Sequence, residues 1–288
     1  MGAADVVPGV SGGTMAFILG IYQELIEAIH AVDVTFVKHL LSFRFNKAFE
    51  GFPYKFLIAL GTGIGLAVFS LARFFSWALT NHPVMVWAFF FGLVLASVLA
   101  VLKRVEWSAF SVLFTALASF GAYILVGLAP LETTEAIWFL FLSGAIAICA
   151  MILPGISGSF ILLLLGKYQF ILTAVVTRDF GTLFIFSCGC GIGLLSFSRL
   201  LRWLLHHHYN NTVAALIGLM IGSLRKVWPW KETVETYIDR HGIAKPLVQS
   251  NTLPEALNPE VGFAIVLTII GFVLVLVLDK VATGREKV

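Results

Sequence analysis

The chain has 288 residues, of which 59% are hydrophobic and 12% are charged, and its mean hydropathy is +0.95. Soluble domains carry about 25% charged residues, so this composition excludes an ordinary soluble protein and predicts a polytopic membrane protein. The formal net charge of +3 does not indicate nucleic-acid binding, because the basic residues fall in short segments between apolar runs. We expect no nucleic-acid partner.

The first segment, residues 1–29, is interrupted near its start by Pro8-Gly9-Val10-Ser11-Gly12-Gly13-Thr14. In lipid, a helix break frees backbone groups that must find other partners, so a break is tolerated only where it is buried in protein or lines a polar cavity. We expect a short arm before this break and a helix from about Thr14. Seven residues precede Pro8, so either the entering arm is short or upstream sequence is missing.

A mixed loop at 30–55 follows, and a long polar stretch occupies 229–260. The predicted apolar spans, in chain order, cover 56–80, 84–102, 108–129, 136–153, 158–176, 181–205, 212–228 and 261–279. Each is long enough, or nearly long enough, to cross a bilayer as a helix.

A second break, Pro154-Gly155-Ile156-Ser157-Gly158-Ser159, repeats the first. When residues 8–29 are placed on 154–175, the identical positions are Pro8, Gly9, Ser11, Gly12, Leu19, Gly20, Tyr22, Gln23 and Ala28. The repeat continues, since Gly61, Gly63 and Gly65 recur as Gly189, Gly191 and Gly193, and Gly92 recurs as Gly218. We expect these glycines to allow close helix packing. The chain therefore reads as two copies of one unit.

Three ordinary spans separate the two breaks. Because an odd number of crossings leaves the chain on the other side of the membrane, the second unit is predicted to be inverted relative to the first. The positive-inside rule agrees, because loop 31–55, Lys103-Arg104, Arg199/Arg202 and the 280–287 tail fall on one side. We predict an all-α polytopic membrane protein with an inverted-topology repeat and two broken or re-entrant helical hairpins that meet near the midplane. The predicted repeats are 1–129 and 130–288, and the second contains an extracytoplasmic loop at 229–260. We expect the protein to lie in the cytoplasmic (inner) membrane.

Each break has a physical use at the start of the helix that follows it. Free backbone N–H groups and the positive end of a helix dipole hold phosphate or carboxylate groups. The predicted phosphate-binding residues of the two breaks are Ser11, Gly12, Gly13, Thr14, Ser157, Gly158 and Ser159. The alternative is that the hydroxyl groups only cap the helices.

Ionisable residues inside spans are further candidates. Arg73 and Arg199 occupy corresponding spans, and a guanidinium can bind two phosphate oxygens at once. The alternative is that both side chains extend to the membrane surface. Asp5 could hold a proton or a sodium ion for coupling, or be a surface acid.

We expect no cofactor and no metal. Cys149, Cys188 and Cys190 lie in apolar runs and favour packing, and His206, His207 and His208 end a span and favour a solvated flank. Both breaks also match Gly-x-Ser-Gly, the nucleophile setting of rhomboid intramembrane proteases. A serine nucleophile needs a nearby base, and every histidine lies at a span end or in a loop, which disfavours that interpretation.

Residues 2–22, from Gly2-Ala3-Ala4-Asp5 through the first break to Tyr22, closely resemble the opening signature of the PopT-type polyprenyl-phosphate transporters, and Leu153–Ser159 resembles the second signature. The resemblance covers essentially the whole chain. It departs at Gln23, where the family pattern has an acid, and family members usually have more sequence before the first motif.

The resemblance implies a lipid translocase, not an enzyme. Its substrate would be undecaprenyl phosphate, moved from the outer to the cytoplasmic leaflet for recycling of the lipid carrier in cell-envelope synthesis. The partners are then this lipid and the surrounding membrane lipids. A homo-oligomer and coupling to a proton or sodium gradient are left open. Two alternatives stay open: a small-anion transporter or channel, and an intramembrane serine hydrolase.

Overall fold

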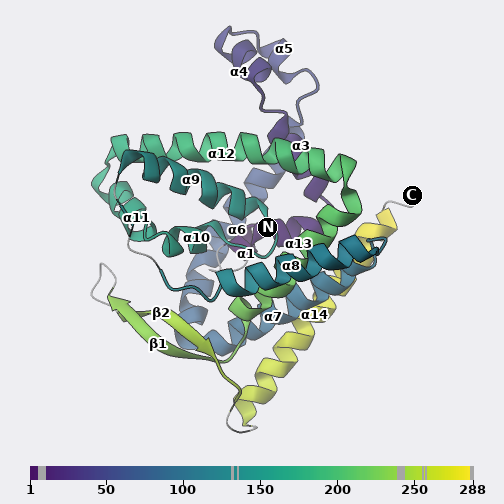
Figure 1. The fold of residues 1–288 in the computed structure, drawn as a ribbon, viewed down its shortest axis with the longest axis vertical. Helices are drawn as coiled ribbons and strands as arrows, with labels where there is room; N and C mark the ends of the chain where they lie inside the picture. Colours follow the sequence, from purple (N-terminus) through teal and green to yellow (C-terminus); the bar gives the residue numbers. More distant parts are fainter. Residues whose placement is uncertain are drawn as a thin grey trace.

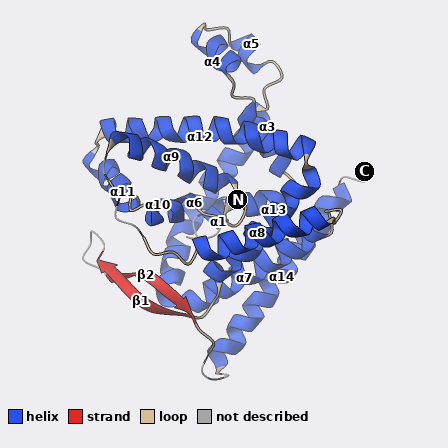
Figure 2. Cartoon of the chain, viewed as in Figure 1, coloured by secondary structure: helices blue, strands red, loops and turns tan. Residues whose placement is uncertain are grey.

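The computed structural model describes residues 1–5, 11–130, 133–134, 136–238, 244–254, 256 and 258–285. Pro8, Gly9 and Val10 of the first break lie outside the described residues. The described chain is helical apart from one β-hairpin (Figures 1 and 2).

Every apolar span predicted from the sequence contains helix. The helices of 16 or more residues are α6 (Tyr54–Asn81), α7 (Pro83–Leu102), α8 (Ala109–Leu125), α9 (Ile137–Ile152), α12 (Phe180–His207), α13 (Tyr209–Val227) and α14 (Pro259–Arg285). Of these, α6, α7, α12 and α14 are long and apolar enough to cross a membrane. The broken pair α10 (Gly158–Leu164) and α11 (Tyr168–Thr177), bent by 104°, is a fifth candidate. The protein is a multi-pass membrane protein.

Both breaks are followed by a short helix and a second interruption that the sequence analysis missed. Helix α2 (Gly12–Ile18) and helix α10 have seven residues each, and they end before Gly20 (φ 72°) and Gly166 (φ 63°). In each case backbone hydrogen bonds close the helix end, such as Ile21 N–H to the Ala16 carbonyl and Lys167 N–H to the Leu162 carbonyl. This left-handed glycine cap stops the helix, and α3 (Tyr22–His30) and α11 then begin.

Two polar segments have more structure than predicted. The 30–55 loop contains α4 (Val34–Leu41) and α5 (Phe45–Phe49), which project from the helical body at the top of Figure 1. The 229–260 stretch forms an antiparallel hairpin of β1 (Lys231–Ile238) and β2 (Ala244–Asn251). The all-α prediction therefore needs this correction. The physical reason is local, because β1 is rich in β-branched residues that favour strands.

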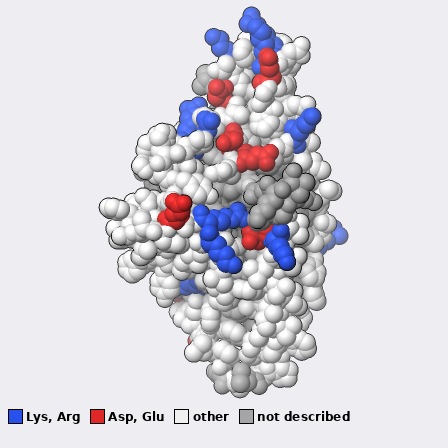
Figure 3. All heavy atoms as spheres, turned by 90° about the vertical axis from the view of Figure 1, so that its right-hand side faces the viewer, with Lys and Arg blue, Asp and Glu red and all other residues white. Residues whose placement is uncertain are grey.

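The helical body is built on two long pairs, α7 with α14 and α8 with α13, while α9 lies along α12 (Figure 1). The buried core gathers where α3, α7 and α13 meet, around Ile26, Val101, Ile217 and Met220. In α6, by contrast, none of the most apolar window is buried, which is expected of a helix facing lipid. Figure 3 shows the charged side chains of one face spread from the top to a little below the middle, above a nearly uncharged lowest part.

The prediction that the repeated glycines allow close helix packing is confirmed for some of them and wrong for others. A Cβ on Gly92 would meet the Thr268 carbonyl, and one on Gly218 would meet the Thr115 carbonyl. In α12, Gly189 and Gly193 press on the backbone of α9 in the same way, whereas Gly191 has open space. For Gly61, Gly63 and Gly65 in α6, no described atom would lie within 4 Å of an added Cβ. Helix α1 (Gly2–Asp5) packs on α6 at Ile64 and Ala67 instead, through Gly2.

Candidate functional site

The two breaks, far apart in sequence, are in direct contact. The Ser11 hydroxyl donates a hydrogen bond to the Leu153 carbonyl (3.2 Å), and the Tyr22 hydroxyl donates to the Ile152 carbonyl (3.3 Å). These carbonyls belong to the end of α9, where a helix leaves acceptors without partners of its own. Ser11 of the first break and Tyr22 of α3 therefore satisfy the helix end that leads into the second break.

The contact also runs in the opposite direction. The Gly155 N–H donates to the Thr14 Oγ1 at 2.9 Å, and this bond is buried. Gly155 has φ +88°, and a Cβ there would lie 2.8 Å from the Ser223 Oγ of α13. A Cβ on Gly13 would lie 2.5 Å from the Ile152 carbonyl oxygen. Only glycine lets the backbones approach this closely.

The start of α2 is closed by the protein's own carboxylate. Asp5 Oδ1 accepts a hydrogen bond from the Gly12 N–H at 2.8 Å, and the Ser11 Oγ accepts one from the Gly13 N–H at 3.1 Å. Ser11 and Thr14 are buried. The carboxylate thus occupies the place at the helix start that an anionic ligand would take.

The start of α10 is open. The Ser157 and Ser159 hydroxyls are hydrogen-bonded to each other at 2.8 Å, and Ser157 does not cap the helix with its side chain. Ser159 is exposed and Ser157 is half-buried, while Gly158 is buried with its Cβ position 2.7 Å from the Ala147 carbonyl. Of the two breaks, the second therefore has hydroxyl groups that are not used to cap its helix.

The predicted arginines are not brought to the breaks. Arg73 in α6 and Arg199 in α12 are both exposed, and no hydrogen bond within the described chain joins either to a break residue. Asp5, the predicted coupling residue, does lie at a break.

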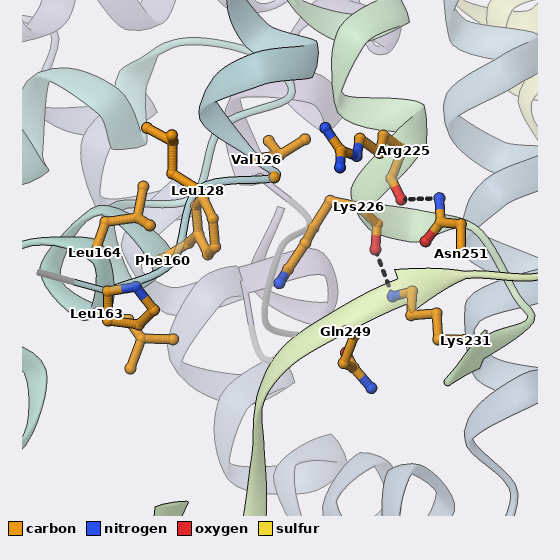
Figure 4. Close-up of a pocket in the computed structure, with 12 residues that line it drawn as sticks. Val126, Leu128, Phe160, Leu163, Leu164, Arg225, Lys226, Lys231, Gln249 and Asn251 are labelled. Carbon is orange, nitrogen blue, oxygen red and sulfur yellow. Dashed lines mark hydrogen bonds between the residues drawn. The ribbon is translucent and has the colours of Figure 1, made fainter. Parts of the chain in front are cut away.

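A pocket beside the second break carries cations that the sequence analysis did not select. It lies between the end of α8, helix α10, the end of α13 and the hairpin, and its basic residues are Arg225, Lys226 and Lys231 (Figure 4). The Lys226 Nζ lies 4.5 Å from the ring centre of Phe160, the third residue of α10. Arg225-Lys226 at a span end is a visible signal, but its proximity to Phe160 depends on the fold.

Comparison with known proteins identifies the family. The model of a family described as undecaprenyl phosphate translocase-like matches residues 1–245. A polyprenyl-phosphate transporter of Vibrio cholerae is 46% identical over 289 residues, which cover 98% of this chain and 94% of that protein. A polyprenyl-phosphate transporter of Staphylococcus aureus is 31% identical over 248 residues, which cover 80% of this chain and 83% of that protein. No solved structure matches.

The resemblance inferred from the two signatures is thereby confirmed across most of the chain's length. The chain is a multi-pass helical membrane protein whose two glycine- and hydroxyl-rich breaks touch, and it matches the family model over residues 1–245 and both relatives over at least 80% of its length. It belongs to the undecaprenyl phosphate translocase-like family.

Proposed function

We propose that this protein moves undecaprenyl phosphate from the outer to the cytoplasmic leaflet of the inner membrane, for recycling of the lipid carrier in cell-envelope synthesis. The observation that carries the proposal is the direct contact between the two breaks, one closed by Asp5 and one open at Ser157 and Ser159. The relatives' names support a polyprenyl-phosphate substrate.

The proposed architecture is an inverted-topology repeat of residues 1–129 and 130–288. Helices α6 and α12 both have 28 residues, and each ends at a histidine of nearly equal geometry, His82 (φ −138°, ψ 55°) and His208 (φ −137°, ψ 47°). Helix α7 pairs with α14 just as its counterpart α13 pairs with α8. This exchange of partners supports two units related by a two-fold axis. Inverted repeats of this kind open to each side in turn.

In the proposed cycle the two breaks bind phosphate alternately. Ser157, Gly158 and Ser159 hold it when the second break is open, and Ser11, Gly12, Gly13 and Thr14 hold it after the first break opens. Asp5 must then leave the Gly12 N–H, so we propose that Asp5 binds a proton or a sodium ion at that step. Arg73 and Arg199, being exposed, would attract the phosphate during its approach or departure.

Transport is favoured over hydrolysis. Ser11 donates to main-chain carbonyls, Ser157 pairs with Ser159, and neither hydroxyl hydrogen-bonds a histidine in the described part of the chain. We therefore propose a transporter and not an enzyme, with no cofactor and no metal. A small-anion transporter or channel is the alternative, and it differs in moving soluble phosphate without a lipid tail.

The test is transfer of undecaprenyl phosphate between leaflets of liposomes containing the purified protein. The double variant Ser157→Ala with Ser159→Ala loses two donors to an ionised phosphate, worth about 1.5–3 kcal/mol each, so we expect at least about tenfold slower transfer. Ser70→Ala is the matched control, because this exposed hydroxyl bonds only its own helix.

The outcomes separate the site from the function. A double variant as fast as wild type would contradict the phosphate site at the second break. Wild-type protein that moves no lipid under either a proton or a sodium gradient would contradict the translocase and favour the anion transporter, which soluble phosphate uptake would then reveal.

A further inference from the structure

Three cations surround the pocket beside the second break without an acidic partner in the described chain. Arg225 and Lys226 lie in the last turn of α13, and Lys231 is the first residue of β1 (Figure 4). The ion pair that the structure does describe joins Arg104 to Asp279 at another place. Three basic side chains gathered in one pocket create, when protonated, a strong local attraction for an anion.

Neutral groups hold each of these cations. Arg225 donates to the Tyr123 carbonyl at 2.8 Å and lies over the Tyr123 ring at 4.4 Å. Lys226 lies over the Phe160 ring, and Lys231 donates to the Lys226 carbonyl and lies 3.8 Å from the Trp87 ring centre. Hydrogen bonds to an ionised phosphate are stronger than such contacts, so an anion can compete for the ammonium groups.

The ionisation of Lys231 depends on whether an anion occupies the pocket. Burial, with a smaller contribution from the neighbouring Lys226, lowers the pKa of Lys231 to about 7. A bound phosphate would compensate the charge and raise this pKa again, because an opposite charge favours the ionised form.

The opposite wall of the pocket is apolar, and this selects among anions. Val126, Leu128, Phe160 and Leu163 line that wall, facing the basic side chains (Figure 4). Inorganic phosphate would use the basic wall alone. A phosphate monoester of an isoprenyl chain would use both walls, with the headgroup on the cations and the first isoprene units on the apolar side chains.

The residues that line the pocket adjoin the second break. Lys226 lies one helical turn beyond Ser223, whose Oγ faces Gly155, and Phe160 directly follows Ser159. We infer that the pocket of Arg225, Lys226 and Lys231 is a docking site for an isoprenyl phosphate, loaded from the membrane side that carries the hairpin before the headgroup passes to Ser157 and Ser159. The inference rests on the proposed function and adds a loading site to it.

The test measures binding and transport separately, with the full-length protein. Binding of farnesyl phosphate and of inorganic phosphate is measured in detergent for wild type and for the double variant Lys226→Gln with Lys231→Gln. We expect the variant to bind farnesyl phosphate at least tenfold more weakly and to transfer undecaprenyl phosphate more slowly. Lys226→Arg should retain binding, and a thermal unfolding scan checks that each variant is folded.

Lys103→Gln is the matched control, since it removes one exposed charge next to Arg104. Arg104 contacts Asp279 near the end of α14 that is farthest from the hairpin. This control should bind and transport as wild type does.

Each other outcome has a definite meaning. Unchanged binding and transport in the folded double variant would overturn the docking site and leave the translocase standing. Equal affinity for inorganic and farnesyl phosphate would overturn the assignment to a lipid headgroup. A third outcome is that wild type binds farnesyl phosphate but moves no lipid, and that the double variant loses the binding. This outcome would overturn the proposed function and leave the pocket's affinity for the isoprenyl phosphate in place.

Discussion

The hydrogen bond between Thr14 and Gly155 connects the two breaks through a single side chain. It is buried, so the Gly155 N–H has no water to replace a lost acceptor. Ser11 and Tyr22 make the neighbouring contacts, both to carbonyls at the end of α9. At the scale of single residues, side chains at and just after the first break therefore hydrogen-bond the backbone of the second break and hold it in place.

Replacing Thr14 tests this contact. Thr14→Val keeps the shape but removes the acceptor, and we expect a loss of about 1–3 kcal/mol in the free energy of unfolding from an unsatisfied buried donor. Thr14→Ser keeps an oxygen and should lose less. Thermal unfolding in detergent measures both, and equal melting temperatures for Val and Ser variants would contradict the role of the hydroxyl.

At the scale of elements, the packing of α7 on α14 and of α8 on α13 depends on glycines. The carbonyls of Thr268 and Thr115 occupy the space that a Cβ on Gly92 or Gly218 would need. In a membrane, apolar side chains gain nothing from leaving lipid, so close backbone contact is a main source of helix association.

Alanine substitutions separate packing glycines from open ones. Gly92→Ala and Gly218→Ala should each lower the melting temperature in detergent. The added methyl group would meet a carbonyl of the facing helix, so the two packed helices would have to move apart. Gly65→Ala, at a position with no described neighbour within 4 Å, should leave stability unchanged or raise it by up to about 1 kcal/mol through helix propensity. A similar loss in all three variants would contradict the distinction.

At the scale of the whole molecule, the ends of α14 define two sides. The hairpin precedes its first residue, Pro259, whereas Asp279 near its last turn contacts Arg104. The positive-inside rule assigns the Arg104 end to the cytoplasm. On this assignment we expect the hairpin, and with it the mouth of the basic pocket, to be extracytoplasmic.

Cysteine labelling in intact cells tests this orientation. In a background with Cys149, Cys188 and Cys190 replaced by alanine, Thr233→Cys in the hairpin should react with a membrane-impermeant maleimide. Lys103→Cys should react only after the membrane is permeabilised. Labelling of both positions from the same side would contradict the orientation and the direction of loading.

The amino-acid sequence was sufficient to predict the class of protein, the positions of the apolar helices, the duplicated breaks and the family. These features are local: apolar length specifies a span, and glycine, proline and hydroxyl residues specify a break. Two further local signals were missed. Gly20 and Gly166 lie in apolar sequence that predicts a continuous helix, and the β-branched residues of β1 lie in a polar stretch that predicts a loop.

Only the tertiary structure decided which break is closed and where the cations gather. Asp5 reaches the Gly12 N–H because α1 and α2 pack together, and nothing in the spacing of these residues distinguishes that contact from a free carboxylate. Arg225, Lys226 and Lys231 meet Phe160 because α13, the hairpin and α10 converge. Hydropathy records whether a residue prefers lipid or water, but a site formed by several elements depends on distances that only packing sets.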